Sequence, residues 1–132
     1  MKIVNVIRAA LTRLGVYAVG EEVSAEDSVA ALAVLNDLLA QYQMQPLMGV
    51  PCDLRLPLSM NDELAIEPPN LLGRVIVTGF ALDLAPDYGI EPSPSLSRLY
   101  LGAVASVKHS NGRMIVKTSD LTIARGAVYA GD

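Results

Sequence analysis

The sequence predicts a mainly α protein: a four-helix bundle with a short extended or hairpin loop between helices two and three, and an extended C-terminal arm. Four segments space their apolar residues as helices do, on one face or nearly all round. Five of the eight prolines lie in residues 46–69, where they forbid a long helix. Residues 113–132 show no helical period, which predicts the arm.

The first helix is expected over residues 2–15, followed by a loop over 16–23. Gly15 is a natural helix stop. The residues on its apolar face follow the i, i+3, i+4 spacing: Ile3, Val6, Ile7, Ala10, Leu11 and Leu14.

The second helix is expected to begin at Ser24 and to run to about residue 45, where Pro46 ends it. Ser24 and Asp27 have the spacing of a capping box, with Asp in place of the usual Glu. One stripe, flanked by Leu35 and Leu38, is predicted to face the core: Val29, Leu32, Ala33, Asn36, Leu39, Ala40 and Gln43.

Residues 46–69 predict a small hairpin or an extended loop. Leu54, Leu56 and Leu58 alternate with other residues, as Leu64 and Ile66 do after the turn at 59–62. Proline removes a backbone donor, so Pro57 would confine its strand to a sheet edge. A long loop in a compact domain usually contacts something, and six of its residues are predicted to face the tail or a neighbouring subunit: Leu54, Arg55, Leu56, Leu58, Asp62 and Glu63.

The third helix is expected over residues 70–85, capped by Asn70 and ended by Pro86. Apolar residues cover nearly all its sides, which predicts the buried helix of the bundle. Gly73 and Gly79 each cost about 1 kcal/mol relative to alanine within a helix. Close approach of another helix is the expected compensation.

The fourth helix is expected over residues 93–109, with Pro94 at the favoured first position and Asn111–Gly112 as its stop. A helical domain therefore covers 1–112 and the arm covers 113–132. The arm is too apolar for a solvated tail and too interrupted for a core, so it should become ordered on a partner. Its predicted contact residues are Arg113, Met114, Ile115, Val116, Lys117, Leu121, Ile123, Arg125, Val128 and Tyr129.

Composition excludes several classes of protein. No apolar run approaches the length of a membrane span, and no segment resembles a signal peptide. One cysteine and one histidine exclude a disulfide within the chain and a two-histidine zinc motif. Net charge is −4, but residues 1–96 carry −7 and residues 97–132 carry +3. The basic end is expected to lie against an acidic surface of the body, of another copy or of another protein.

Candidate chemistry is sparse. Glycosidases use two neighbouring carboxylates as general acid and base. Two groups of acidic residues are close enough in the sequence to be candidates for such a pair: Asp83 with Asp87, and Asp62 and Glu63 with Glu67. A helix end and a solvated loop explain them better, with Asp87 bracing a turn. His109 is expected at the end of the fourth helix, where a charged imidazole interacts well with the helix C-terminus. A reactive thiol needs positively charged neighbours, and Arg55 is the only basic residue near Cys52 in the sequence. No phosphate-binding glycine motif, metal motif or cofactor motif is present.

Several other residues are candidates for contacts with another molecule, and each also has a simpler explanation within the chain or in solvent. Five bases are too scattered for a nucleic-acid site and suit ion pairing with protein: Arg98, Lys108, Arg113, Lys117 and Arg125. Gly79 with Ala81 and Ala85 marks a helix crossing within the chain or a seam between subunits. Tyr100 and Tyr129 are anchors at an interface or ordinary packed tyrosines. Arg8 and Arg13 pair with a neighbouring subunit or are solvated.

Several stretches together resemble a known family. They are the segments 6–11 (VIRAAL), 35–42 (LNDLLAQY), 59–64 (SMNDEL) and 84–89 (LAPDYG), followed by Ser93–Leu96. In this order they resemble the head-to-tail adaptor proteins of tailed bacteriophages, also called head-completion or packaged-DNA-stabilisation proteins. The resemblance covers about residues 3–112. The sequence departs from the family after Gly112.

The resemblance implies a structural protein of the virion that is assembled in the host cytoplasm. Such adaptors are small helical bundles that form a ring, usually of twelve copies, beneath the portal protein. They extend the channel for double-stranded DNA without sequence-specific binding and present a surface to the tail nozzle or next tail component. No enzyme activity, cofactor or membrane is implied. Two alternatives are an acidic-residue hydrolase with cell-wall lytic activity, using Asp62, Glu63 or Glu67, and a small helical DNA-binding regulator.

Overall fold

The computed structural model describes residues 1–51, 53–64 and 71–123, with side chains described up to residue 112. Four helices form the fold: α1 (Ile3–Leu14), α2 (Ala25–Gln43), α3 (Leu71–Leu84) and α4 (Pro94–Ile123). Two short 3₁₀ helices, η1 (Pro46–Met48) and η2 (Ala85–Tyr88), follow α2 and α3. The described ranges contain no strand. The predicted mainly α, four-helix fold is confirmed.

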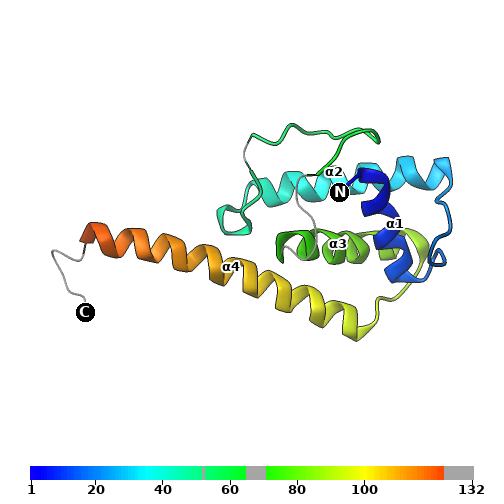
Figure 1. Ribbon diagram of the computed structural model, residues 1–132. Helices are drawn as coiled ribbons and strands as arrows, with labels where there is room; N and C mark the ends of the chain where they lie inside the picture. Colours follow the sequence, from blue (N-terminus) through cyan, green and yellow to red (C-terminus); the bar gives the residue numbers. More distant parts are fainter. Residues whose placement is uncertain (52, 65–70, 124–132) are drawn as a thin grey trace.

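Helix α3 is the centre of the fold. It packs against α1, α2 and α4, which surround it in Figure 1. Its buried residues lie on all sides of the helix, as the sequence predicts: Gly73, Val75, Ile76, Val77, Thr78, Gly79, Phe80, Ala81 and Leu84. The polar group of buried Thr78 is satisfied locally, because its hydroxyl donates to the Arg74 carbonyl at 2.8 Å. The predicted cap Asn70 lies outside the described residues.

Helix α1 forms where its pattern predicts. It buries Ile3, Val6, Ile7, Ala10 and Leu11 on one face. Gly15 ends it with a left-handed φ of 81°, and its N–H bonds the carbonyls of the last turn. Short i, i+3, i+4 patterns with a glycine stop are therefore sufficient here to place a helix.

Helix α2 begins as predicted, because the Ser24 side chain accepts a hydrogen bond from the Asp27 N–H at 3.2 Å. Its predicted core stripe is wrong in part. Val29 is 68% exposed, and Ala33 and Ala40 are also exposed. The residues that face the core are Ser28, Ala31, Leu35, Leu38, Leu39 and Tyr42. Since α2 is apolar on two sides, packing rather than pattern chooses the buried one.

The connection between α2 and α3 forms no hairpin within its described residues. It lies beside α2 as an extended loop after η1 (Figure 1). Two polar side chains of α2 hold it. Asn36 accepts from the Leu58 N–H at 2.7 Å and donates to the Leu58 carbonyl at 3.1 Å, and Gln43 donates to the carbonyls of Pro51 and Leu54. The side-chain amides of Asn36 and Gln43 thus bond backbone groups of the loop that a neighbouring strand would otherwise bond.

The end of this loop pairs with the start of the chain. Lys2 and Glu63 form an isolated antiparallel bridge. The Ile3 N–H donates to the Asp62 carbonyl at 3.2 Å, and the Leu64 N–H donates to the Met1 carbonyl at 2.8 Å. The chain start is thus fixed against residues more than 60 positions away.

Helix α4 is longer than predicted. It runs for 30 residues through the expected stop at Asn111–Gly112, a length of about 45 Å. The predicted boundary at Gly112 therefore lies inside a helix, and residues 113–123 are helical rather than extended. His109, expected at a helix end, lies within the helix and has no C-terminal dipole nearby. In Figure 1 the last turns of α4 extend beyond every other helix.

Candidate interaction surface

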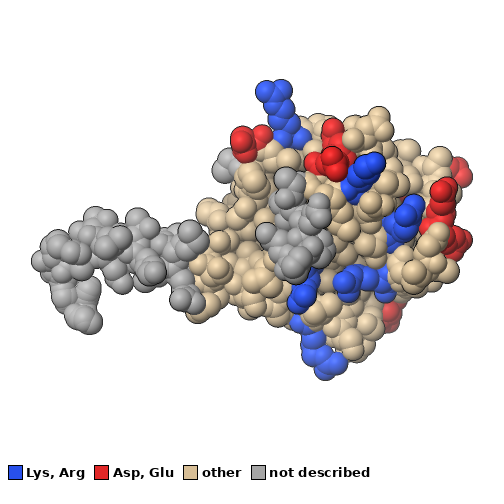
Figure 2. Space-filling view, viewed as in Figure 1, with Lys and Arg blue, Asp and Glu red and all other residues tan. Residues whose placement is uncertain are grey.

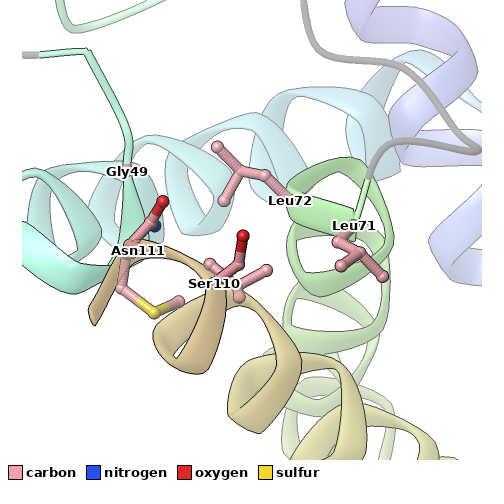
Figure 3. Close-up of a pocket in the computed structure, with 7 residues that line it drawn as sticks. Gly49, Leu71, Leu72, Ser110 and Asn111 are labelled. Carbon is pink, nitrogen blue, oxygen red and sulfur yellow. The ribbon is translucent and has the colours of Figure 1, made fainter. Parts of the chain in front are cut away.

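A candidate interaction surface lies where α4 leaves the rest of the fold. A pocket of about 360 Å³ opens there between η1, the first turn of α3 and α4 (Figure 3). Its lining combines apolar side chains with polar groups of α4: Met48, Gly49, Leu71, Leu72, Val107, Ser110 and Asn111. This open, mixed surface is a candidate for a contact with another protein.

Asn111 fixes the point at which α4 leaves the body. Its Nδ2 donates to the Leu47 carbonyl at 2.6 Å, and Figure 3 shows the side chain directed toward Gly49. Gly49 has a φ of +79°, and a Cβ added there would lie 2.9 Å from the Asn111 Nδ2. Asn111 is thus engaged by η1 and stays helical, whereas the sequence suggests a helix stop.

A second groove continues along α4 toward its start. It has a volume of about 280 Å³ and shares Leu71 with the first pocket. Its other lining residues are Arg74, Arg98, Leu99, Gly102, Ala103 and Ser106. Leu71 and Leu99 are 40% and 38% exposed. The groove therefore combines accessible leucine side chains with two guanidinium groups.

Gly79 marks a close approach within the chain. A Cβ at this position would lie 2.5 Å from the Tyr42 Oη and 2.9 Å from the Tyr100 Cε1. The two hydroxyls are 3.0 Å apart, within hydrogen-bond distance. Burial, followed by the hydrogen bond with Tyr100, raises the pKa of Tyr42 well above its usual range. The interpretation of Gly79 as a helix crossing within the chain is supported, and Tyr100 has a partner in α2.

A cluster of two tyrosines and one aspartate connects η2 to the start of α2. The Tyr17 hydroxyl donates to the Asp27 carboxylate at 2.5 Å, and Tyr88 also bonds Asp27. Burial, with the Asp27 charge and hydrogen bond second, raises the pKa of Tyr88 to about 12. The Tyr88 of the LAPDYG segment therefore holds η2 against α2. Gly89 ends η2 with a φ of 64°, and its N–H donates to the Pro86 carbonyl at 3.1 Å.

The predicted contact residues of the loop divide into two kinds. Leu58 is buried and Leu54 and Leu56 are half-buried, so the leucines cover the core. Arg55, Asp62 and Glu63 are exposed. The Asp62 carboxylate accepts from the Ser59 N–H at 2.7 Å, which gives it a role in the turn. The loop thus contributes charges rather than leucines to the surface.

The predicted arm is placed only in part. Its residues Arg113, Met114, Ile115, Val116, Lys117, Leu121 and Ile123 belong to α4, and their side chains lie outside the described set. Arg125, Val128 and Tyr129 lie outside the described residues altogether. The structure therefore gives the arm a helical first part and tests none of its contacts.

The acidic candidates that the structure describes, Asp62, Glu63, Asp83 and Asp87, are all exposed. Asp83 and Asp87 are both largely exposed, and partial desolvation raises the pKa of Asp83. The turn that Asp87 was expected to brace is closed by backbone hydrogen bonds, from the Gly89 N–H to the Pro86 carbonyl and from the Ile90 N–H to the Ala85 carbonyl. Glu67 and Cys52 lie outside the described residues. Within the described ranges, no three acidic, histidine or cysteine side chains gather in a way that could hold a metal ion.

Charges on the body are mixed. In Figure 2 basic side chains are spread from the top to the bottom of the face shown, while acidic ones lie toward its upper and right edges. Arg13 is exposed, and the half-buried Arg8 has a buried Nε without a hydrogen-bond partner in the described structure. The acidic total of residues 1–96 thus produces no continuous acidic field on this face.

Sequence reasoning missed the residues that shape this surface. Asn36 and Gln43, which bind the loop after η1 rather than line the pocket or the groove, interrupt an apolar stripe, and this was a usable sign that backbone groups would bind them. Leu71, Arg74 and Leu99 gave no such sign, because their grouping depends on how α3 crosses α4. Asn111 gave the opposite sign, that of a helix end.

No protein-family model, curated protein or solved structure matches the chain. The resemblance to phage adaptors therefore stays a prediction made from the sequence. Among the residues that the structure describes, every helix is too short or too polar to span a lipid bilayer.

Proposed function

We propose that this protein is a structural head-to-tail connector of a tailed bacteriophage. In this role copies form a ring beneath the portal protein, extend the DNA channel, help to retain the packaged DNA and dock the tail. The protein catalyses nothing, and DNA passes through without sequence-specific binding. Its place is the head–tail interface of the virion.

The observation that carries the proposal is the end of α4, whose last turns extend beyond the rest of the fold (Figure 1). In proteins most of the stability of a helix comes from the tertiary packing of one of its faces. Residues 113–123 prolong a helix that is already nucleated, and they gain further stability when a partner covers them. In an adaptor, the portal or a neighbouring copy is such a partner.

The body supports the same role. Two open concave surfaces lie along α4, and Asn111 fixes this helix against η1. Among the side chains of α4 that the structure describes, which end at Gly112, the buried apolar residues are Leu96, Ala103 and Val107. The packed half can therefore keep its fold while the other half binds.

Light scattering of the full chain, alone and with the matching portal protein, tests the proposal. We expect one copy to join each portal subunit. A chain ending at Gly112 should stay folded by circular dichroism and lose portal binding. Val116→Pro keeps the chain length and breaks the helix, so it should lose binding as well.

A full chain that does not bind the portal at any salt concentration would contradict the proposal. A chain without residues 113–132 that enters particles as well as the full chain does would contradict the portal contact of these residues and leave the connector role standing.

A further inference from the structure

The groove between the first turn of α3 and α4 has the chemistry of a receptor for an acidic, partly apolar segment. Leu71, Leu99 and Ala103 supply its apolar surface, and Arg74 and Arg98 add two positive charges. Its volume of about 280 Å³ accommodates an aliphatic side chain. Both leucines remain more than one third exposed, so the groove is unfilled by the described part of its own chain.

The turn before α2 has the complementary chemistry. Val19 is 90% exposed, the highest value among the large apolar side chains of the described residues. Gly20 follows with a φ of +85°, and the Glu21 N–H donates to the Ala18 carbonyl at 3.0 Å. The Glu21 Oε1 accepts from the Ala18 N–H at 2.9 Å, so the turn holds Val19 outward before any partner arrives. Binding a segment that is already ordered costs less conformational entropy.

Acidic charge surrounds this valine. Glu21, Glu22 and Glu26 are all exposed, and the stretch from Val16 to Asp27 contains no Lys or Arg. In Figure 1 the turn lies between α1 and α2 at the right end, and Figure 2 shows acidic side chains at the same edge. The groove lies toward the other end of α3, so the two surfaces of one molecule are apart.

We infer that the Ala18–Glu22 turn of one copy docks into the Leu71–Arg74–Arg98–Leu99 groove of the next copy, with Val19 inserted and the glutamates facing the arginines. The inference rests on the proposed function, because it names a contact between neighbours in the ring. Since the two surfaces differ, the contact is heterologous, and such contacts produce rings when the rotation closes. Exposed ion pairs contribute little each, so the contact should be weak in the free protein and sensitive to salt.

Disulfide trapping between two full-length copies tests the contact. Both copies carry Cys52→Ser. One carries Ala18→Cys, beside Val19, and the other carries Ser106→Cys, in the groove lining. The matched control replaces Ser106→Cys by Ala105→Cys, the next residue along α4, which is also exposed and does not line the groove. Since a disulfide needs Cα atoms within about 7 Å, we expect heterodimers from the 18–106 pair and a much lower yield from the 18–105 pair.

Charge exchange sharpens the test. Arg98→Glu should lower the yield of the 18–106 disulfide about threefold, in keeping with exposed pairs. Adding Glu22→Arg in the copy that carries Ala18→Cys should restore it. A merely structural effect of Arg98→Glu would not be reversed by a substitution on another molecule.

The trapping is measured in free protein and after addition of the portal, with portal binding followed separately by light scattering. If the 18–106 yield does not exceed the 18–105 yield in either sample, the inference is wrong, whatever the portal binding. If the portal alone protects the Ser106→Cys thiol from a soluble maleimide without an 18–106 disulfide, the groove belongs to the portal and the inference is wrong. Trapping without portal binding supports this contact while the proposed function fails.

Discussion

The two halves of α4 differ in what holds them. The half up to Asn111 packs on α3 and η1 and buries Leu96, Ala103 and Val107. The half beyond Gly112 continues the same helix past the other elements (Figure 1). The first part of α4 is thus stabilised by tertiary burial, whereas its last turns extend past the other elements, where a partner can cover them.

The largest expected effect is on the packed half. Gly79→Ala puts a Cβ 2.5 Å from the Tyr42 Oη and 2.9 Å from the Tyr100 Cε1, and so forces these side chains of α2 and α4 away from α3. We expect a loss of about 2 kcal/mol in the free energy of unfolding, measured by urea titration.

Gly102→Ala is the matched control for Gly79→Ala. Gly102 also lies in a helix, and a Cβ there meets nothing within 4 Å. It should stabilise the helix by up to about 1 kcal/mol. Equal effects of the two substitutions would show that the contact with the tyrosines is unimportant.

The junction of the two halves gives a smaller effect of the opposite sign. A Cβ at Gly112 meets nothing within 4 Å, and the residue lies inside α4. Gly112→Ala should therefore favour helix by about 1 kcal/mol. The measurement is amide hydrogen exchange over residues 113–123, where protection should increase. Reduced protection would indicate a left-handed helix end at Gly112 and would contradict the continuous helix.

The smallest expected effect is a pH dependence confined to the body. The pKa of Tyr88 is raised to about 12 in the fold, so the folded state keeps a proton that the unfolded state loses above about pH 10. Stability contributed by Tyr88 is therefore complete below pH 10 and decreases as pH rises toward 12. At neutral pH Tyr88→Phe should cost about 1 kcal/mol, since it removes the hydrogen bond to Asp27.

The check for Tyr88 is the difference in unfolding free energy between the wild type and Tyr88→Phe across this range. We expect the difference to become smaller as pH rises from 10 to 12. A constant difference would mean that the neutral hydroxyl of Tyr88 contributes nothing through its raised pKa.

The sequence was a good guide where local and tertiary preferences agree. Gly15 ends α1 and Ser24 caps α2 because both act through their own backbone neighbourhood. Apolar residues cover nearly all sides of α3, so the sequence predicted that this helix would be buried at the centre of the bundle. Of the candidate surface, only the loop after α2 was predictable, and the contacts of the C-terminal segment stay a prediction.

Two errors have the same cause. Val29 and Ala33 were assigned to the core and Asn111–Gly112 to a helix end, because each local pattern favoured those outcomes. In the structure α2 turns Ala31 and Leu35 inward instead, and η1 engages Asn111 through the Leu47 carbonyl. Both outcomes depend on residues distant in sequence, which no local pattern contains.

By itself the sequence determined four helices, their order and the starts and stops set by Ser24, Gly15 and the prolines, because these act within a few residues. Tertiary structure alone decided which side of α2 is buried, that Gly79 admits Tyr42 and Tyr100, and that Leu71, Arg74, Arg98 and Leu99 share one groove. These depend on how helices cross, and helix crossings are set by the packing of whole faces.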